Sequence, residues 1–159
     1  MIYWLNRRVE RAFESYLRTI VGGQMRVYRS ADIASREFPC AVVRAHQNRR
    51  FSGETNATNI MSVSVVVLTE YARTIDDSAV VVEEFEEIEE RCVSAVLEAV
   101  YTNGLPALLN GVGVPGVTIS YAALGSEDEN PVTSQSDEDG TVSIVEIPLR
   151  VMAGATEIN

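Results

Sequence analysis

Lysine is absent from the 159-residue sequence, so all thirteen basic residues are arginines, and histidine occurs once, as His46. A Ser-His-Asp or Cys-His catalytic group would have to use His46, which precedes a polar stretch and which we interpret as a surface residue. Cysteine occurs twice, as Cys40 and Cys92, with neither a CxxC pair nor a second histidine to complete a zinc site. We interpret both cysteines as small buried hydrophobic residues. The sequence predicts no metal, no cofactor and no catalytic residue.

Long apolar runs are also absent. None approaches the ~18 residues of a membrane-spanning helix, so no membrane partner is expected. The glycine-rich stretch 111–116 lacks the GxGxxG spacing of a dinucleotide-binding loop, and we interpret it as a turn before a strand. Apolar residues make up 46% of the chain and charged residues 23%, as in ordinary folded domains. The length suits one domain over residues 1–159, and nothing in the composition indicates an enzyme.

Charge is divided unevenly along the chain. Residues 1–50 contain ten arginines and four acidic residues, a net charge of +6, whereas residues 51–159 contain three arginines and nineteen acidic residues, a net charge of −16. The formal net charge of −10 therefore combines a basic part and an acidic part. Arginine suits partly desolvated interfaces, although codon bias in a GC-rich genome explains the missing lysines equally well.

Residues 5–21 are predicted to form an amphipathic helix that ends at Gly22-Gly23. Apolar residues recur at helical spacing, and arginines project on the opposite flank, which carries much of the early positive charge. The apolar set is Ile2, Leu5, Val9, Phe13, Tyr16 and Ile20, and the basic set is Arg7, Arg8, Arg11 and Arg18.

Residues 77–103 have the strongest helical pattern, with Asp76 or Asp77 as the N-terminal cap. One face is apolar and wider than packing on a sheet requires, and the opposite face is acidic. Glu89 projects into the apolar stripe, where a buried carboxylate needs a partner, and arginine is the natural one. The apolar face contains Val81, Val82, Phe85, Ile88, Cys92, Val93, Ala95, Val96, Ala99 and Val100, and the acidic face Glu83, Glu86, Glu87, Glu90 and Glu98.

The first predicted hairpin joins strands at 39–46 and 60–72, where apolar residues alternate with polar ones. Its tip is the polar connection 47–59, which is basic at its start because of Arg49 and Arg50. Residues 24–29 are compatible with a further short strand.

The second predicted hairpin joins strands at 117–123 and 141–153, and the odd-numbered residues of the former are expected on one face. Pro148 indicates an edge position or a bulge. The connection 124–140 contains no basic residue, and a structureless connection of this length is usually functional or mobile. Its acidic residues are Glu127, Asp128, Glu129, Asp137, Glu138 and Asp139.

Together these elements predict an α+β fold. We expect a mainly antiparallel four-stranded sheet made from two long hairpins, with an N-terminal helix and a long central helix packed on one face. The extended hairpin tips are placed at 47–59 and 124–140.

This arrangement resembles the tail terminator (tail completion) proteins of long-tailed bacteriophages. The resemblance is carried by the helix that begins Leu5-Asn6-Arg7-Arg8-Val9-Glu10, the hairpin Pro39–Ala72, the helix Asp77–Asn103 and the closing hairpin Val117–Ala153. In that family a small α+β subunit forms a hexameric ring that caps the tail tube and joins it to the head connector. Other neck and tail ring proteins share similar subunits.

The resemblance implies a homo-oligomeric ring in the virion tail or neck, assembled in the host cytoplasm. Its implied partners are the tail tube protein and a head-connector or stopper protein. Double-stranded DNA would pass through without specific binding, because an acidic lumen offers the phosphates no cations.

A ring requires two different patches that complement each other around a closed cycle, and the charge division supplies two such patches. We expect basic residues of the first helix and first hairpin tip to meet acidic residues of the second helix. The predicted interface residues are Arg7, Arg8, Arg11, Arg18, Arg49, Arg50, Phe51, Glu83, Glu87 and Glu90.

Two alternatives stay open. One is a non-catalytic adaptor or ligand-binding module, and the other is a metal-dependent nuclease whose acidic ligands lie in the 124–140 connection, where preorganisation is poor. The adaptor surface would contain Ser62, Ser64, Thr118 and Ser120, and the metal ligands would be Asp137 with Asp139 or Glu127 with Asp128.

Overall fold

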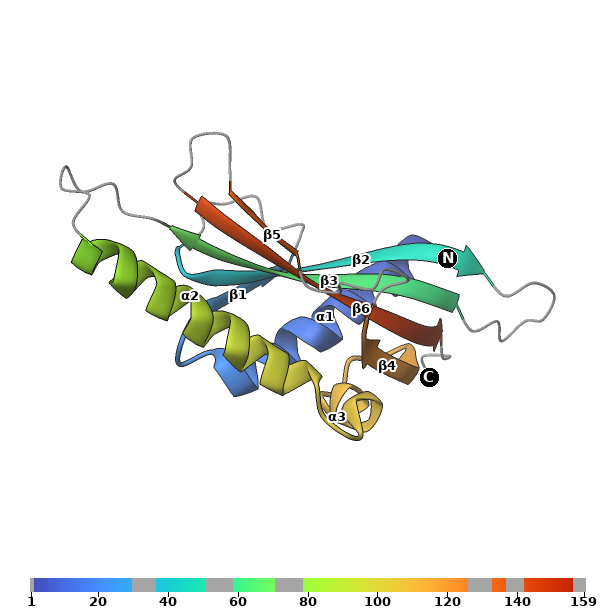
Figure 1. The fold of residues 1–159 in the computed structure, drawn as a ribbon. Helices are drawn as coiled ribbons and strands as arrows, with labels where there is room; N and C mark the ends of the chain where they lie inside the picture. Colours follow the sequence, from blue (N-terminus) through green and yellow to red (C-terminus); the bar gives the residue numbers. More distant parts are fainter. Residues whose placement is uncertain are drawn as a thin grey trace.

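The computed structural model describes residues 2–29, 37–50, 59–70, 79–125, 133–136 and 142–155. In these ranges the chain forms three helices and six strands (Figure 1). In chain order the elements are α1 (Ile2–Val21), β1 (Arg26–Arg29), β2 (Cys40–Arg50), β3 (Asn59–Glu70), α2 (Ala79–Val100), α3 (Leu105–Gly111), β4 (Val117–Leu124), β5 (Thr133–Ser136) and β6 (Val142–Ala155).

The described strands form one mixed sheet in the order β1-β2-β3-β6-β4, with β5 paired to β6. β1 runs parallel to β2, and the other described pairings are antiparallel. The predicted four-stranded antiparallel sheet is therefore wrong, because β1 and β5 add two strands and β1 introduces a parallel pair. The helical layer also differs from the prediction, since the segment 77–103 is replaced by a helix that ends at Val100 and a turn that leads into a third helix.

β1 forms within residues 24–29, which the sequence allows as a short strand, whereas β5 is too short and too polar for a periodic pattern to reveal it. β1 and β5 have four residues each, and β5 has the sequence Thr-Ser-Gln-Ser. Thr133–Ser136 is a strand because it pairs with Ser143–Glu146 of β6, a contact that local sequence does not encode. The connection 124–140, expected to be without structure, therefore contains a strand.

β6 changes partners at Pro148. On one side β6 pairs with β3 from Val142 to Ala153, whereas on the other side its first half meets β5 and its second half meets β4. The Pro148 carbonyl accepts a hydrogen bond from the Gly125 N–H at 3.0 Å, so the backbone of Pro148 faces the β4 side. An N–H at position 148 would point to the place between the β5 and β4 pairings of β6. Proline, which lacks this N–H, is therefore tolerated in an interior strand.

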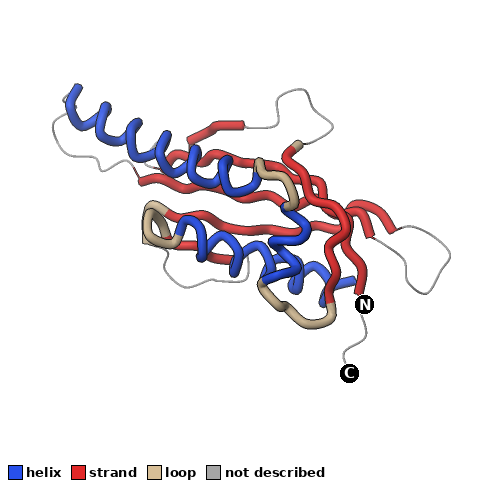
Figure 2. The backbone as a smooth tube through the Cα atoms, turned by 90° about the horizontal axis from the view of Figure 1, so that it is seen from below, coloured by secondary structure: helices blue, strands red, loops and turns tan. Residues whose placement is uncertain are grey.

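The three helices lie against the same face of the sheet, and the other face is uncovered by them (Figure 1 and Figure 2). β3 alternates between buried and half-exposed residues, as a strand with one covered face should. The core between the layers includes Val9, Phe13 and Leu17 of α1, Met61, Val63, Val65 and Val67 of β3, Cys92 and Val96 of α2, and Ile147, Leu149 and Val151 of β6.

α2 and α3 are joined by a sharp turn. Gly104 has a φ of 78°, in the left-handed region that favours glycine, and it directly precedes α3. No single helix among the described residues is long and apolar enough to cross a membrane. Phe85–Val100 and Leu105–Gly111 meet the length and composition requirement only as a pair, and that pair is bent by 93°.

A buried hydrogen bond joins α1 to the end of α2. The Tyr16 hydroxyl donates to the Ala99 carbonyl oxygen at 2.6 Å, and burial raises the pKa of Tyr16 above its ordinary value of 10.0. α1 ends at Val21, and a side chain at Gly22 would collide with the carbonyl oxygen of Arg18. Ile20, which was expected in the apolar stripe, is exposed.

An extra residue in β4 changes which of its side chains face the core. The register with β6 shifts between Ile119 and Tyr121, so Ser120 is a bulge residue. Ile119 and Ala122 are buried, and Tyr121 is exposed. The prediction that Tyr121 shares a face with Ile119 is therefore wrong, because a one-residue shift moves the following side chains to the opposite face.

Candidate assembly surfaces

Part of the α1 arginine flank is used inside the molecule. Arg8 Nη1 donates to the Gly116 carbonyl oxygen at 3.1 Å, which ties α1 to the turn before β4. Arg7 is half-buried and has a partner within the chain, whereas Arg11 is exposed. Among these three arginines, Arg11 is therefore the one best placed to meet another molecule.

Glu14 holds the end of α1 against β1. Its carboxylate oxygens form ion pairs with Arg18 Nη1 at 3.0 Å and with Arg29 Nε at 2.9 Å. Arg18 Nη2 also donates to the Val27 carbonyl oxygen at 3.1 Å. Because the Arg26 N–H bonds to the β2 side, the neighbouring Val27 faces the outer edge of the sheet, and Arg18 caps that edge.

Glu10 is a buried acid that was not predicted to be functional. Its side chain is almost fully enclosed, and its Oε1 accepts a hydrogen bond from the Ala45 N–H at 3.1 Å. β1 stops pairing at Arg29, opposite Val43, so the Ala45 N–H lies beyond the end of that partner strand. The carboxylate thus supplies a buried acceptor for this N–H beyond the pairing of β1. In the sequence, the signal for this burial is that Glu10 directly follows Val9, a member of the apolar set of the predicted helix.

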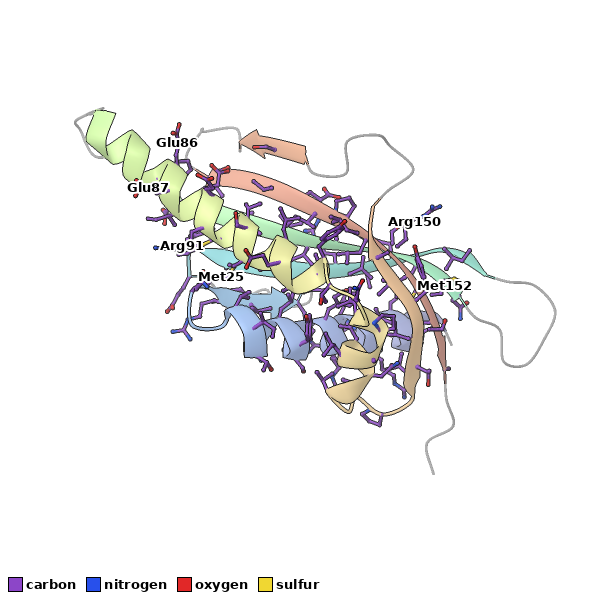
Figure 3. The ribbon with its side chains drawn as sticks, turned by 60° about the horizontal axis from the view of Figure 1, so that its bottom comes forward. Met25, Glu86, Glu87, Arg91, Arg150 and Met152 are labelled. Carbon is purple, nitrogen blue, oxygen red and sulfur yellow. The ribbon has the colours of Figure 1, made fainter. Side chains whose placement is uncertain are left out.

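The acidic face of α2 is exposed. Glu86, Glu87, Glu90 and Glu98 all lie at the surface, and Figure 3 shows Glu86 and Glu87 at the opposite end of the molecule from Arg150. Glu83 belongs to α2, but its side chain lies outside the described residues. The interface role of Glu83, Glu87 and Glu90 remains a prediction.

Glu89 has a different partner from the one expected. It is half-buried, and the Ser143 hydroxyl of β6 donates to its Oε1. The expectation of an arginine partner is wrong for this contact, because a carboxylate that keeps part of its solvent shell does not require a counter-charge. The contact ties the middle of α2 to the start of β6.

The two predicted hairpin tips are only partly described. Arg49 and Arg50 belong to β2 and pair with Ile60 and Asn59, so they extend the strand past a bulge at Asn48. Their side chains lie outside the described residues, as does Phe51. The same holds for the predicted mobile acidic residues Glu127, Asp128, Glu129, Asp137, Glu138 and Asp139.

Three of the four residues proposed for an adaptor surface already have partners in the chain. Ser64 Oγ donates to Glu146 Oε1 at 3.0 Å, and Ser120 Oγ donates to a carbonyl of β6 at 3.2 Å. Ser62 also has a partner within the chain, and Thr118 is exposed. These contacts stabilise the sheet and leave less hydrogen-bonding capacity for a ligand.

Asn110 of α3 caps the first half of the β4 edge. The Ile119 N–H donates to Asn110 Oδ1 and the Asn110 Nδ2 donates to the Ile119 carbonyl oxygen, both at 2.8 Å. The amide therefore occupies both backbone groups that Ile119 directs away from β6. A further strand could not pair there without displacing Asn110.

The second half of the β4 edge has its backbone groups directed outward. The Gly125 N–H bonds to β6, and Ala123, two residues earlier, therefore faces β6 as well. The N–H and C=O groups of Ala122 and Leu124 consequently point away from β6. An open depression of about 630 Å³ borders this segment, lined by Val100, Tyr101, Thr102, Asn103 and Ala122–Leu124.

The histidine and the cysteines show no sign of a metal centre. His46 is exposed, as predicted, and Cys40 and Cys92 are free and buried, as predicted. Burial raises the pKa of the Cys92 thiol, and the neighbouring Arg91 offsets part of that rise. Across the described ranges, no three His, Cys, Asp or Glu side chains come together as metal ligands. The acids proposed for a nuclease lie outside those ranges.

Comparison with known proteins finds similarity in structure but not in sequence. No protein-family model matches the sequence, and no curated protein matches it. A chain from the virion of a native gene transfer agent (GTA) particle is similar in fold, with a TM-score of 0.48 and 12% sequence identity. The likeness covers 87% of this chain and 84% of that chain. At this level it carries no conclusion about function.

Proposed function

We propose that the chain is a non-catalytic structural protein of a phage-like virion. Copies of it form a ring, which we take to be hexameric, that ends the tail tube and joins it to the head connector. The proposal rests chiefly on the two unlike surfaces of one subunit. The outer face of α2 exposes Glu86, Glu87 and Glu90, whereas Arg11 is exposed on α1. A closed ring requires such a pair of different patches.

The arrangement of the long strands also supports the proposal. The β2–β3 hairpin and the β4–β6 pair are both present, and these are the hairpins on which the resemblance to tail terminators was based. A net charge of −10 suits a ring through which DNA passes, because a duplex is not retained by an acidic wall.

Imaging and mass measurement test the proposal directly. Native mass spectrometry and electron microscopy of the purified chain should show closed rings, either alone or after mixing with tail tube subunits. Adding the chain to growing tubes should stop growth at one end, and a matched amount of an unrelated acidic protein should not. A chain that stays monomeric under both conditions contradicts the proposal.

A further inference from the structure

The exposed large hydrophobic residues fall into two groups at opposite edges of the sheet. Among the described side chains they are Ile20 and Phe38 near β1, and Tyr101, Leu108 and Tyr121 near β4. β1 and β4 end the strand order on opposite sides. Exposed aromatic and aliphatic residues gathered in this way are typical of interaction surfaces.

The first group, named the β1 patch, consists of Ile20 and Phe38. The Met25 N–H bonds to the Val21 carbonyl oxygen at 3.1 Å, which brings the end of α1 to the start of β1. Arg26 pairs with Cys40 and forms an ion pair with Glu37 at 3.2 Å, so the segment that contains Phe38 lies beside the same end of β1. The β1 patch is therefore formed by two segments of chain brought to one end of the sheet.

The second group includes Tyr101, which lines the depression beside β4. Tyr101 is 79% exposed at its rim, and no residue that lines it carries a charge. The outward backbone groups of Ala122 and Leu124 border the same depression. The site thus offers one exposed aromatic side chain together with polar side chains and backbone hydrogen-bonding groups, which suits another polypeptide.

We infer that the β4 depression receives the β1 patch of a second copy of this chain. The inference rests on the proposed ring and assigns its contact: Phe38 and Ile20 of one copy pack against Tyr101 of the next. The two surfaces differ and lie on opposite edges, as a head-to-tail contact that closes a ring requires. An uncharged lining lets two chains that each carry −10 meet without placing like charges at the centre of the contact.

Two charge-introducing variants of the full chain test this contact. Tyr101→Asp disables the depression and Phe38→Asp disables the β1 patch, so each variant alone should lose its rings and remain monomeric. Mixed in equal amounts, the two variants should form dimers but no rings, because each pair retains one intact contact and the next contact is disabled on both sides. Ser134→Asp adds the same charge to an exposed residue of β5 and should form rings normally.

Native mass spectrometry of the four samples separates the outcomes. Dimers in the mixture show that both variants are folded and that these two surfaces meet. Rings from either variant alone, or a mixture that stays monomeric, overturn the inference and leave the proposed function intact. If the variants form normal rings that no longer end tail tubes, the depression binds another virion protein, and this result also overturns the inference. Absence of rings from the unmodified chain, even with tail tubes, refutes the proposed function itself.

A backbone variant tests the outward N–H of Leu124. Leu124→Pro removes that N–H at an edge position where proline is tolerated, and Leu124→Ala removes the side chain while keeping the N–H. We expect the proline variant to bind the neighbouring copy about tenfold more weakly than the alanine variant, about 1.4 kcal/mol. Equal ring stability of the two variants would exclude a backbone hydrogen bond at this residue.

Discussion

The hydroxyl of Tyr16 stabilises the contact between α1 and α2 through one hydrogen bond. Tyr16→Phe removes the hydroxyl donor, so the buried carbonyl oxygen of Ala99 loses this hydrogen bond. We expect a loss of about 1–2 kcal/mol in the free energy of unfolding, measured by urea denaturation. Tyr28→Phe is the matched control, because the Tyr28 hydroxyl accepts a hydrogen bond at an exposed site. An equal effect of both substitutions would contradict the expectation.

The Tyr16 hydroxyl should also make the stability of the folded protein depend on pH in the alkaline range. Burial raises the pKa of Tyr16 above 10.0, so the folded protein holds this proton more tightly than the unfolded chain. The resulting stability is complete below pH 10.0 and is lost as the pH rises through the higher value of the folded state. The difference in unfolding free energy between the wild type and Tyr16→Phe should therefore shrink above that pH. A constant difference would show that Tyr16 does not titrate differently in the two states.

A second prediction at the scale of single residues concerns Glu10. Glu10→Ala leaves the buried Ala45 N–H without its acceptor, which should lower the free energy of unfolding by about 1–3 kcal/mol. Glu10→Gln keeps an acceptor oxygen and should cost less. Hydrogen exchange at Ala45 gives a local measure, because this amide should lose protection in the alanine variant and keep most of it in the glutamine variant. Unchanged protection in both would show that Glu10 does not hold β2.

At the scale of elements, Asn110 determines how α3 is held against β4. Asn110→Asp keeps the oxygen that accepts from the Ile119 N–H but removes the donor to the Ile119 carbonyl oxygen. We expect a loss of about 1–3 kcal/mol in the free energy of unfolding. Ser134→Asp, at an exposed residue of β5, is a control for the added charge. The two variants should differ clearly in urea denaturation.

The elements also show how much of this fold the sequence could predict. Long strands with a clear alternation, such as Asn59–Glu70, and the helix over Ile2–Val21 were predicted to within a few residues. A short strand at β1 was compatible with the sequence, but its parallel pairing with β2 was not predictable, and the polar residues of β5 have no strand pattern that would predict their pairing with β6. The bulge at Ser120 inverted the assignment of Tyr121 for the same reason, because one inserted residue has no signal in a short alternation.

The candidate contact residues were harder to predict than the elements. Arg8 and Arg18 looked like free surface charges on a helical projection, yet both hydrogen-bond to carbonyl oxygens of other segments. Tyr101 falls within the segment predicted as helix but lies just past the actual end of α2, so its exposure beside β4 follows only from the tertiary fold. A projection gives the face of a helix but not what packs against it.

At the scale of the whole molecule, the division of charge leads to a test with Arg11. Reversing Arg7, Arg8 and Arg11 together would not isolate the surface charge, because Arg8→Glu also breaks the hydrogen bond to Gly116. Arg11→Glu changes an exposed residue and should leave the fold intact while weakening assembly at low salt. The effect should fade as salt rises, as seen by sedimentation velocity. Assembly unchanged at low salt would make the charge division incidental.

The capped edges of the sheet have a consequence for how copies of this chain behave when crowded. A strand with a free edge can recruit identical strands without limit and seed filaments. Here a guanidinium covers Val27 on β1 and an amide covers Ile119 on β4, so each of these two edges is interrupted by a side chain. An interrupted edge recruits a continuous ribbon of identical strands less readily than an unbroken one.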